Sequence, residues 1–261
     1  MKLPQYQIDA FSDKVFHGNP AAIVPLEEWL DDTLLQRIAM ENNLSETAYF
    51  VKNDTGYHLR WFTPEYEIDL CGHATLASAY VIKNFIAPHL SEIIFSTEKA
   101  GILKASAHDG LYTLDFPSRV PQPCPVPDDL LKSIGIDTAV EVLRSRDYFV
   151  VLPDEESVLN AEPDYSIMKE LDTIGVIITA KGHHSDVVSR CFYPGAGIPE
   201  DPVTGSAHCN IVPYWAEKLK KNKLFCRQLS PRSGDLHCEL KGDRVLMSGK
   251  CALFMKGEIY I

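Results

Sequence analysis

The chain has 261 residues, of which 45% are hydrophobic and 23% are charged, so it is long enough to bury a sizeable core in one large domain or two smaller ones. Its formal net charge of −11 argues against nucleic acid or an anionic membrane as a partner, because both need a surplus of Lys and Arg. No apolar run reaches the roughly 20 residues that span a bilayer, and the first residues do not resemble a signal peptide. We therefore expect a cytoplasmic protein.

The cysteines and histidines do not have the spacing of a metal site. The seven cysteines include no Cys-x-x-Cys pair, so reduced thiols are the simplest interpretation. The adjacent pairs His183–His184 and His208–Cys209 have side chains that diverge on any regular element. We therefore predict no bound metal.

In chain order, the first predicted element is a strand around residues 5–10, where Tyr6, Ile8 and Ala10 alternate with polar residues. A helical pattern over 34–39 follows and precedes a strand at 48–51. The stretch 74–82 carries no charge and predicts a helix that is buried on every side. Further strands are predicted at 92–97, 112–116, 176–179, 236–240 and 244–247, with hairpin turns at 108–110 and 241–243.

A proline-rich segment lies near the middle of the chain. Residues 117–128 read PSRVPQPCPVPD and predict a stiff, extended linker, because a central strand or helix cannot contain so many prolines. We therefore divide the chain into residues 1–118 and 119–261, with the last strand free to pack back on the first half.

The two sides of this linker repeat one pattern. RWFTP at 60–64 corresponds to RCFYP at 190–194, an offset of 130 positions (190 − 60). Each half then has an acidic loop, a glycine and an apolar stretch, which begins at Gly72 or at Gly205. Pro213 predicts that the second apolar helix bends or that its first segment ends there. The repeat favours a duplicated α+β fold of two pseudo-symmetric halves, each a strand-rich, barrel-like sheet around a central helix.

The start of each apolar helix is a candidate anion site. A buried helix that begins at a glycine leaves N–H groups free in its first turn, and its dipole favours negative charge there. If both helix ends face one cleft, backbone dipoles can hold a carboxylate or a developing oxyanion despite the net charge. The polar residues that flank the two glycines are Asp69, Cys71, His73, Glu200, Asp201, Thr204 and Ser206.

Several stretches together resemble the PhzF-like phenazine biosynthesis family. They are DAFSDKVFHGNPAAIV (9–24), NNLSETAYF (42–50), RWFTPEYEIDLCGHATLASA (60–79), EDPVTGSAHC (200–209) and QLSPRSGDL (228–236). The resemblance covers nearly the whole chain, and it implies the diaminopimelate-epimerase fold, a homodimer, no cofactor and an isomerase that acts on a small anionic carboxylate. The Cys-Gly-His-Ala-Thr form at 71–75 departs from the branch that makes phenazines, so the phenazine precursor is only a guide to the substrate.

Carried over by position, the resemblance assigns the catalytic roles to Glu46, His73 and Asp201. Glu46 would move a proton between two carbons of the substrate, while His73 and Asp201 would fix its polar groups. Ser206 would hydrogen-bond the carboxylate or the developing oxyanion. The residues expected to line the substrate site are Gly72, Ala74, Thr204, Gly205 and Ser206.

Other interpretations remain open. Without the resemblance, the sequence favours interpreting Glu46 as a solvated acid in a loop. His73 would then be a residue at the start of a helix, and Asp201 would cap a helix. A two-base amino-acid racemase or epimerase could use Cys71, but the position that corresponds to Cys71 in the second half is Thr204. A third alternative is a non-catalytic protein that binds a small molecule or a partner.

Overall fold

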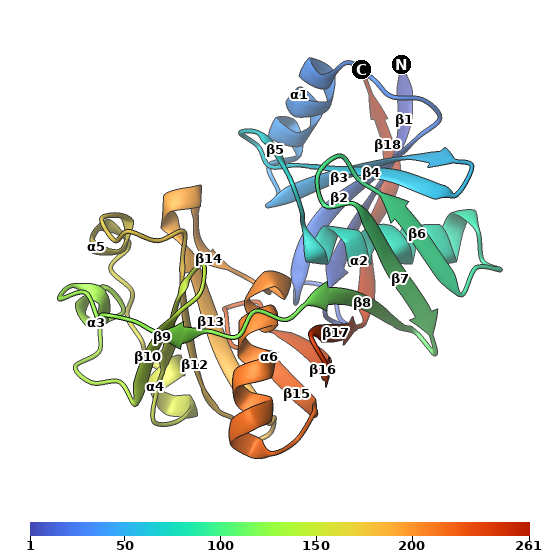
Figure 1. Cartoon of the computed structure of the whole chain (residues 1–261). Coiled ribbons are helices and arrows are strands. Elements are labelled where there is room, and N and C mark those ends of the chain that lie inside the picture. The colour runs from blue at the N-terminus through green and yellow to red at the C-terminus, as the bar shows by residue number, and fades with distance from the viewer. The chain divides into compact units, whose positions relative to one another are not determined.

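The computed structural model describes residues 1–261 (Figure 1). Contacts between Cα atoms divide the chain into two compact units: unit 1 comprises Met1–Asp115 and Ser248–Ile261, and unit 2 comprises Phe116–Met247. The last strand, β18 (Cys251–Tyr260), pairs antiparallel with the first, β1 (Lys2–Ala10), so the C-terminal residues complete the sheet of unit 1.

The sheet of unit 1 runs in the order β18–β1–β2–β3–β4–β6–β7–β8. Neighbouring strands are antiparallel except for the parallel pairs β2–β3 and β4–β6. Its other elements are β2 (Asn19–Leu26), α1 (Asp32–Asn42), β3 (Glu46–Asn53), β4 (Gly56–Phe62), β5 (Glu67–Ile68), α2 (Gly72–Val81), a π-helical turn (Ile82–Ile86), β6 (Glu92–Ser96), β7 (Ile102–His108) and β8 (Leu111–Pro117).

The sheet of unit 2 runs in the order β9–β10–β11–β12–β13–β15–β16. Its parallel pairs are β11–β12 and β13–β15, and the other pairs are antiparallel. The elements are β9 (Gln122–Pro123), α3 (Leu130–Ser133), β10 (Glu141–Arg144), β11 (Tyr148–Val151), α4 (Glu155–Leu159), α5 (Tyr165–Lys169), β12 (Val176–Lys181), β13 (Val187–Tyr193), a 3₁₀ turn (Pro194–Ala196), β14 (Ile198–Asp201), α6 (Gly205–Leu219), β15 (Lys223–Gln228), β16 (Gly234–Lys241) and β17 (Arg244–Gly249).

The two units therefore share one topology, which confirms the duplication. The run β1–β2–β3–β4–β6–β7 has the same sequence of parallel and antiparallel pairs as β10–β11–β12–β13–β15–β16. Arg60 donates two hydrogen bonds to Glu67, and Arg190 donates two to Glu200. The guanidinium of Arg60 also lies over the ring of Phe62, and that of Arg190 lies over the ring of Phe192.

A helix buried on nearly all sides lies at the centre of each unit, as its lack of charge predicted. In α2 every residue from His73 to Ala79 is buried, and the helix packs on β1, β2, β3 and β7 (Figure 1). In α6 the residues from Ala207 to Ala216 are buried, and the helix packs on β15 and β16. Burial of apolar surface on both helices supplies much of the core.

Of the two outcomes predicted at Pro213, a bend in the helix or its end, the end is wrong. The helix is continuous from Gly205 to Leu219 with Pro213 inside it. Proline has no N–H to bond the carbonyl four residues earlier, which is that of Cys209. The backbone N–H of Arg119 donates to this carbonyl instead, at 2.8 Å, so the carbonyl keeps a partner and the helix continues.

The proline-rich segment 117–128 begins with the last residue of β8 and contains one further short strand, and the two predicted turns are present. Gln122 and Pro123 form β9 at the edge of the sheet of unit 2, where a missing N–H is tolerated. Asp109 and Gly110 both have positive φ, 48° and 77°, as a tight hairpin between β7 and β8 requires. Gly242, between β16 and β17, also has positive φ, at 63°.

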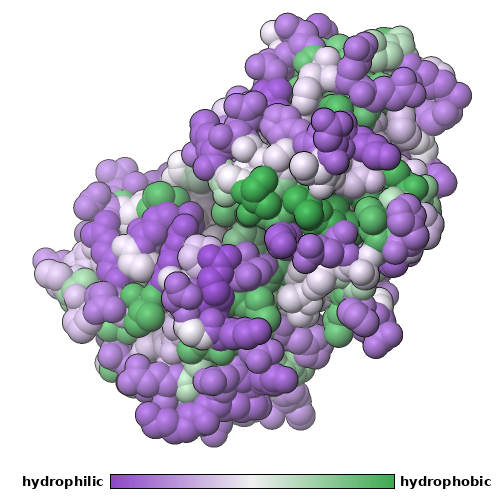
Figure 2. Space-filling view, turned by 45° about the vertical axis from the view of Figure 1, so that its right-hand side comes forward, coloured by the Kyte–Doolittle hydropathy of each residue, from purple (hydrophilic) through white to green (hydrophobic).

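No helix combines the length and the apolar character needed to cross a membrane. Hydrophilic residues cover most of the face seen in Figure 2, and hydrophobic residues appear there as smaller patches.

The Arg190–Glu200 pair should stabilise unit 2 more than a surface pair does. Both side chains are only 11% exposed, so Glu200→Gln leaves a buried guanidinium without its carboxylate. Because Arg190 keeps bonds to three backbone carbonyls, we expect a loss of about 1–3 kcal/mol in the free energy of unfolding. Urea unfolding measures the change. Glu92→Gln in the exposed Lys104–Glu92 pair is the control, with a change below about 0.5 kcal/mol. Equal losses in the two variants would contradict the prediction.

Candidate functional site

Glu46 is the first residue of β3 and is only 6% exposed. The chain reaches it through a short turn: α1 ends at Asn43, which has the left-handed conformation (φ 48°) that Asn tolerates. β3 then runs parallel to β2, with Glu46 opposite Ala21. The strand therefore fixes this acid in the interior of unit 1, and the interpretation of Glu46 as a solvated loop acid is wrong.

His73 and Cys71 belong to the start of α2. Cys71 is the N-cap residue, its side chain makes no capping hydrogen bond, and His73 lies in the first turn. Nε2 of His73 is 3.0 Å from Oε2 of Glu46, while Sγ of Cys71 is 3.4 Å from Nδ1 of the same ring. The contact with Glu46 lacks the alignment of a hydrogen bond, so Oε2 is a buried acceptor without a hydrogen-bond partner.

The charges in this cluster compensate one another. Burial alone lowers the pKa of His73, but the neighbouring Cys71 and Glu46 raise it by more, so its pKa lies well above the usual value. The pKa of Cys71 is raised to about 11, first by burial and then by the charge of Glu46. Cys71 is therefore best described as a thiol and His73 as an imidazolium. A thiolate base at Cys71 is disfavoured.

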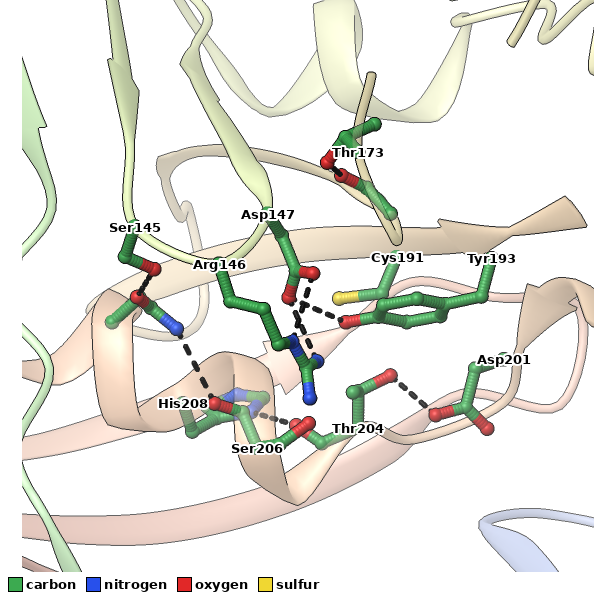
Figure 3. Close-up of polar contacts among 12 residues, drawn as sticks. Ser145, Arg146, Asp147, Thr173, Cys191, Tyr193, Asp201, Thr204, Ser206 and His208 are labelled. Atoms are coloured by element: carbon green, nitrogen blue, oxygen red, sulfur yellow. Dashed lines mark hydrogen bonds and ion pairs between the residues drawn. The ribbon is translucent and has the colours of Figure 1, made fainter. Parts of the chain in front are cut away.

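The start of α6 carries a different set of groups (Figure 3). Thr204 is the N-cap residue and, like Cys71 in α2, makes no side-chain capping bond. Its hydroxyl donates to the carboxylate of Asp201 at 2.5 Å. Gln228, fully buried, accepts from the Thr204 N–H at 2.8 Å and donates to the Asp201 carbonyl at 2.6 Å. The N-cap residue of α6 is thus Thr204, and Gln228 and Thr204 fix the turn that holds Asp201.

A second buried network in unit 2 was not predicted. Asp147, only 1% exposed, accepts from Nε and an Nη of Arg146 at 3.0 and 2.9 Å, and the Tyr193 hydroxyl lies 3.5 Å from it (Figure 3). Burial raises the pKa of Tyr193, so its phenol remains a hydrogen-bond donor. The sequence SRDY at 145–148 reads as an ordinary charged turn, and nothing in it signals a buried acid.

The other predicted residues lie where the two helices begin. Gly72 and Gly205 are the first residues of α2 and α6, Ala74 is fully buried, and Ser206 is half-buried in the first turn of α6. Unit 1 thus brings Glu46 and His73 into contact, and unit 2 brings Asp201 and Thr204 into contact. That both helix ends face one cleft stays a prediction.

Comparison with known proteins gives a consistent relationship over the whole chain. The sequence model for the family described as phenazine biosynthesis-like protein matches residues 8–257. An uncharacterized isomerase of Pseudomonas aeruginosa is 48% identical, with 100% of both chains covered. A crystal structure of a PhzF-family phenazine biosynthesis protein from Enterococcus faecalis is 47% identical, covers 100% of both chains and has a TM-score of 0.97.

More distant structures share the fold alone. A hydroxyproline epimerase from Agrobacterium vitis is 10% identical, with a TM-score of 0.63 over 99% of this chain and 92% of that one. The predicted sheet-rich, duplicated α+β fold of the epimerase type is confirmed by these neighbours and by the topology of the two units.

His208 should make unit 2 sensitive to acid. It is fully buried in α6, its Nδ1 bonds the Thr204 carbonyl at 2.8 Å, and burial lowers its pKa to about 4. In the unfolded chain His208 binds a proton below about pH 6.5, whereas in the folded chain it stays neutral down to about pH 4. The free energy of unfolding should therefore fall by about 1.4 kcal/mol for each pH unit between these two values. Urea unfolding at pH 7 and pH 5 should show a smaller fall for His208→Gln than for wild type. The exposed variant His89→Gln should lose as much free energy of unfolding between these pH values as wild type does. A fall in His208→Gln as large as that of wild type would contradict the lowered pKa of His208.

Proposed function

The chain belongs to the phenazine biosynthesis-like (PhzF) family, and from this premise we propose that it shifts a proton on a small carboxylated substrate with Glu46 as the base. The name isomerase, carried by three relatives that are 41–48% identical over at least 99% of each chain, supports the reaction class. The chain is an isomerase; the base and the kind of substrate are the proposal.

The observation that carries the proposal is the environment of the Glu46 carboxylate. It is buried, its Oε2 has no hydrogen-bond partner, and the nearest charge is the His73 ring 3.0 Å away. A carboxylate that is not fully hydrogen-bonded keeps a lone pair to accept a proton from carbon. The cationic ring of His73 lies beside the carboxyl group without using that lone pair.

In the proposed reaction Glu46 removes an acidified C–H proton and returns it to another carbon of the same conjugated substrate. Glu46 is neutral between the two transfers, and the negative charge then resides on the substrate. The cationic edge of His73 stabilises that charge, because it lies beside the group that has just lost its own. One base therefore serves both steps, and no net proton is gained or lost.

The kind of substrate follows from the positive potential at the starts of the two central helices. Neither α2 nor α6 has a side-chain cap, so their first N–H groups are available to a carboxylate. In unit 2 the charges of Arg119, Arg146 and Arg244 all act on Cys209 of α6, where they oppose the rise in thiol pKa that burial causes. This local positive charge supports a small anion as substrate although the chain carries −11.

Within this proposal Asp201, Thr204, Gly205 and Ser206 bind the substrate's polar groups. Asp201 is held by Thr204 and Gln228, so its carboxylate has a defined direction. Ser206 and the backbone at Gly205 lie in the first turn of α6, where a carboxylate or an oxyanion is favoured. The homodimer expected from the resemblance stays a prediction.

The role of Glu46 is tested with Glu46→Gln, which keeps the shape of the side chain but cannot accept the proton. We expect transfer of deuterium from D₂O into a metabolite to fall by about 10²–10⁴-fold. The measurement is mass spectrometry of a metabolite extract incubated with the enzyme in D₂O, followed by kinetics on the labelled compound. Glu41→Gln, at an exposed acid that is the penultimate residue of α1, is the control. Exchange by Glu46→Gln at the wild-type rate would exclude Glu46 as the base.

The contribution of unit 2 is tested with Asp201→Asn. Because this change removes the charge that accepts the Thr204 hydroxyl, we expect a higher KM or a lower kcat by about 10-fold or more, with the free energy of unfolding lowered by at most about 2 kcal/mol. Steady-state kinetics on the labelled metabolite and urea unfolding separate these effects. Asp243→Asn, at an exposed turn of the same unit, should leave both unchanged. Wild-type kinetics in Asp201→Asn would restrict the reaction to residues of unit 1.

A further inference from the structure

Three side chains of unit 1 form a compact set of potential metal ligands. One ligand atom from each of Glu46, Cys71 and His73 lies within 4.8 Å of the others, and all three residues are buried. The set combines a carboxylate oxygen, a thiol sulfur and an imidazole nitrogen, each a donor that zinc accepts. The sequence did not predict it, because Glu46 is remote in the chain from the Cys-x-His pair.

The distances fit a shared ion closely. Zinc binds sulfur at about 2.3 Å and nitrogen or oxygen at about 2.0–2.2 Å, which places tetrahedral ligands about 3.3–3.6 Å apart. Nε2 of His73 is 3.0 Å from Oε2 of Glu46 and 3.9 Å from Sγ of Cys71. These two separations differ from the tetrahedral value by a few tenths of an ångström, and the third pair of ligand atoms lies within 4.8 Å, so small side-chain movements would bring the three atoms around one centre.

The local structure favours such movements over larger ones. Cys71 has an extended backbone at the N-cap of α2, and its carbonyl is fixed by the N–H and the hydroxyl of Thr75. Glu46 is fixed by the pairing of β3 with β2. The backbones that carry the ligands are thus rigid, and Oε2 is a buried acceptor that still lacks a hydrogen-bond donor. A thiolate and a carboxylate together would balance the charge of a divalent ion.

We propose that Glu46, Cys71 and His73 bind one Zn²⁺ ion and that the bound ion blocks the proton transfer assigned to Glu46. Zinc bonds the Glu46 oxygen, the imidazole nitrogen and the thiolate, and two protons, one from the thiol and one from the imidazolium, pass to solvent. Three protein ligands leave a fourth position for water. The binding part stands on the cluster alone, whereas the inhibition part rests on the proposed function.

Binding is tested with zinc chloride and the purified full-length chain, freed of metal by a chelator. Competition with a chromogenic chelator should show one zinc per wild-type chain, and cobalt substitution should give the near-ultraviolet absorption of a cobalt–thiolate bond. Cys71→Ser should weaken zinc binding by about 100-fold or more and abolish that absorption. Glu46→Gln, which keeps the thiol, should weaken binding but retain the absorption. Cys251→Ser, a thiol of the same unit outside the cluster, is the matched control.

The outcomes separate this proposal from the function. Zinc binding that is unchanged in Cys71→Ser, or absent from wild type, would overturn the metal site and leave the isomerase untouched. If zinc binds through Cys71 but deuterium exchange continues at the wild-type rate with the site filled, the inhibition fails, and with it the assignment of Glu46 as the base. The proposal expects exchange to fall in proportion to the fraction of chains with zinc and to recover when the chelator is added.

Discussion

The chemistry depends on one buried contact, that between the Glu46 carboxylate and the His73 imidazole. An isolated carboxylate in the interior would become neutral, because burial strongly disfavours its charge. The imidazole lies 3.0 Å from this carboxyl group, and the Cys71 thiol beside the ring completes the cluster. The proposed base and the cationic ring beside it therefore have to be considered together.

Duplication explains why the two units share a topology but not a site. Both retain the Arg–Glu pair, the ring beneath the guanidinium and the uncapped buried helix, which are features of the fold. The N-cap residue, in contrast, is Cys71 in α2 and Thr204 in α6. The thiol of one unit thus has no counterpart in the other, and the pair of thiols that a two-base racemase would use is missing at these positions.

The sequence predicted elements whose signal is local. The uncharged stretch of α2, the strand at residues 5–10 and the Asp109–Gly110 turn each depend on neighbouring residues, and each was predicted correctly, although Gln5 and Asp9 on the polar face of that strand are buried. Prediction from the sequence failed where contacts between residues far apart in the chain decide the structure. The N–H of Arg119 keeps α6 continuous at Pro213, and Tyr193, 46 positions from Asp147, lies against this buried acid. The contact between Glu46 and His73 likewise depends on strand pairing. The resemblance assigned a role to each residue, but it did not predict the distance between their side chains.

Because β18 closes the sheet beside β1, the order of synthesis matters for this chain. As the protein leaves the ribosome, all of Phe116–Met247 is available before Cys251–Tyr260 has been made. Unit 2 can therefore fold during translation, while one edge of β1 remains unpaired until β18 emerges. Removal of β18 would leave that edge of β1 exposed to other chains.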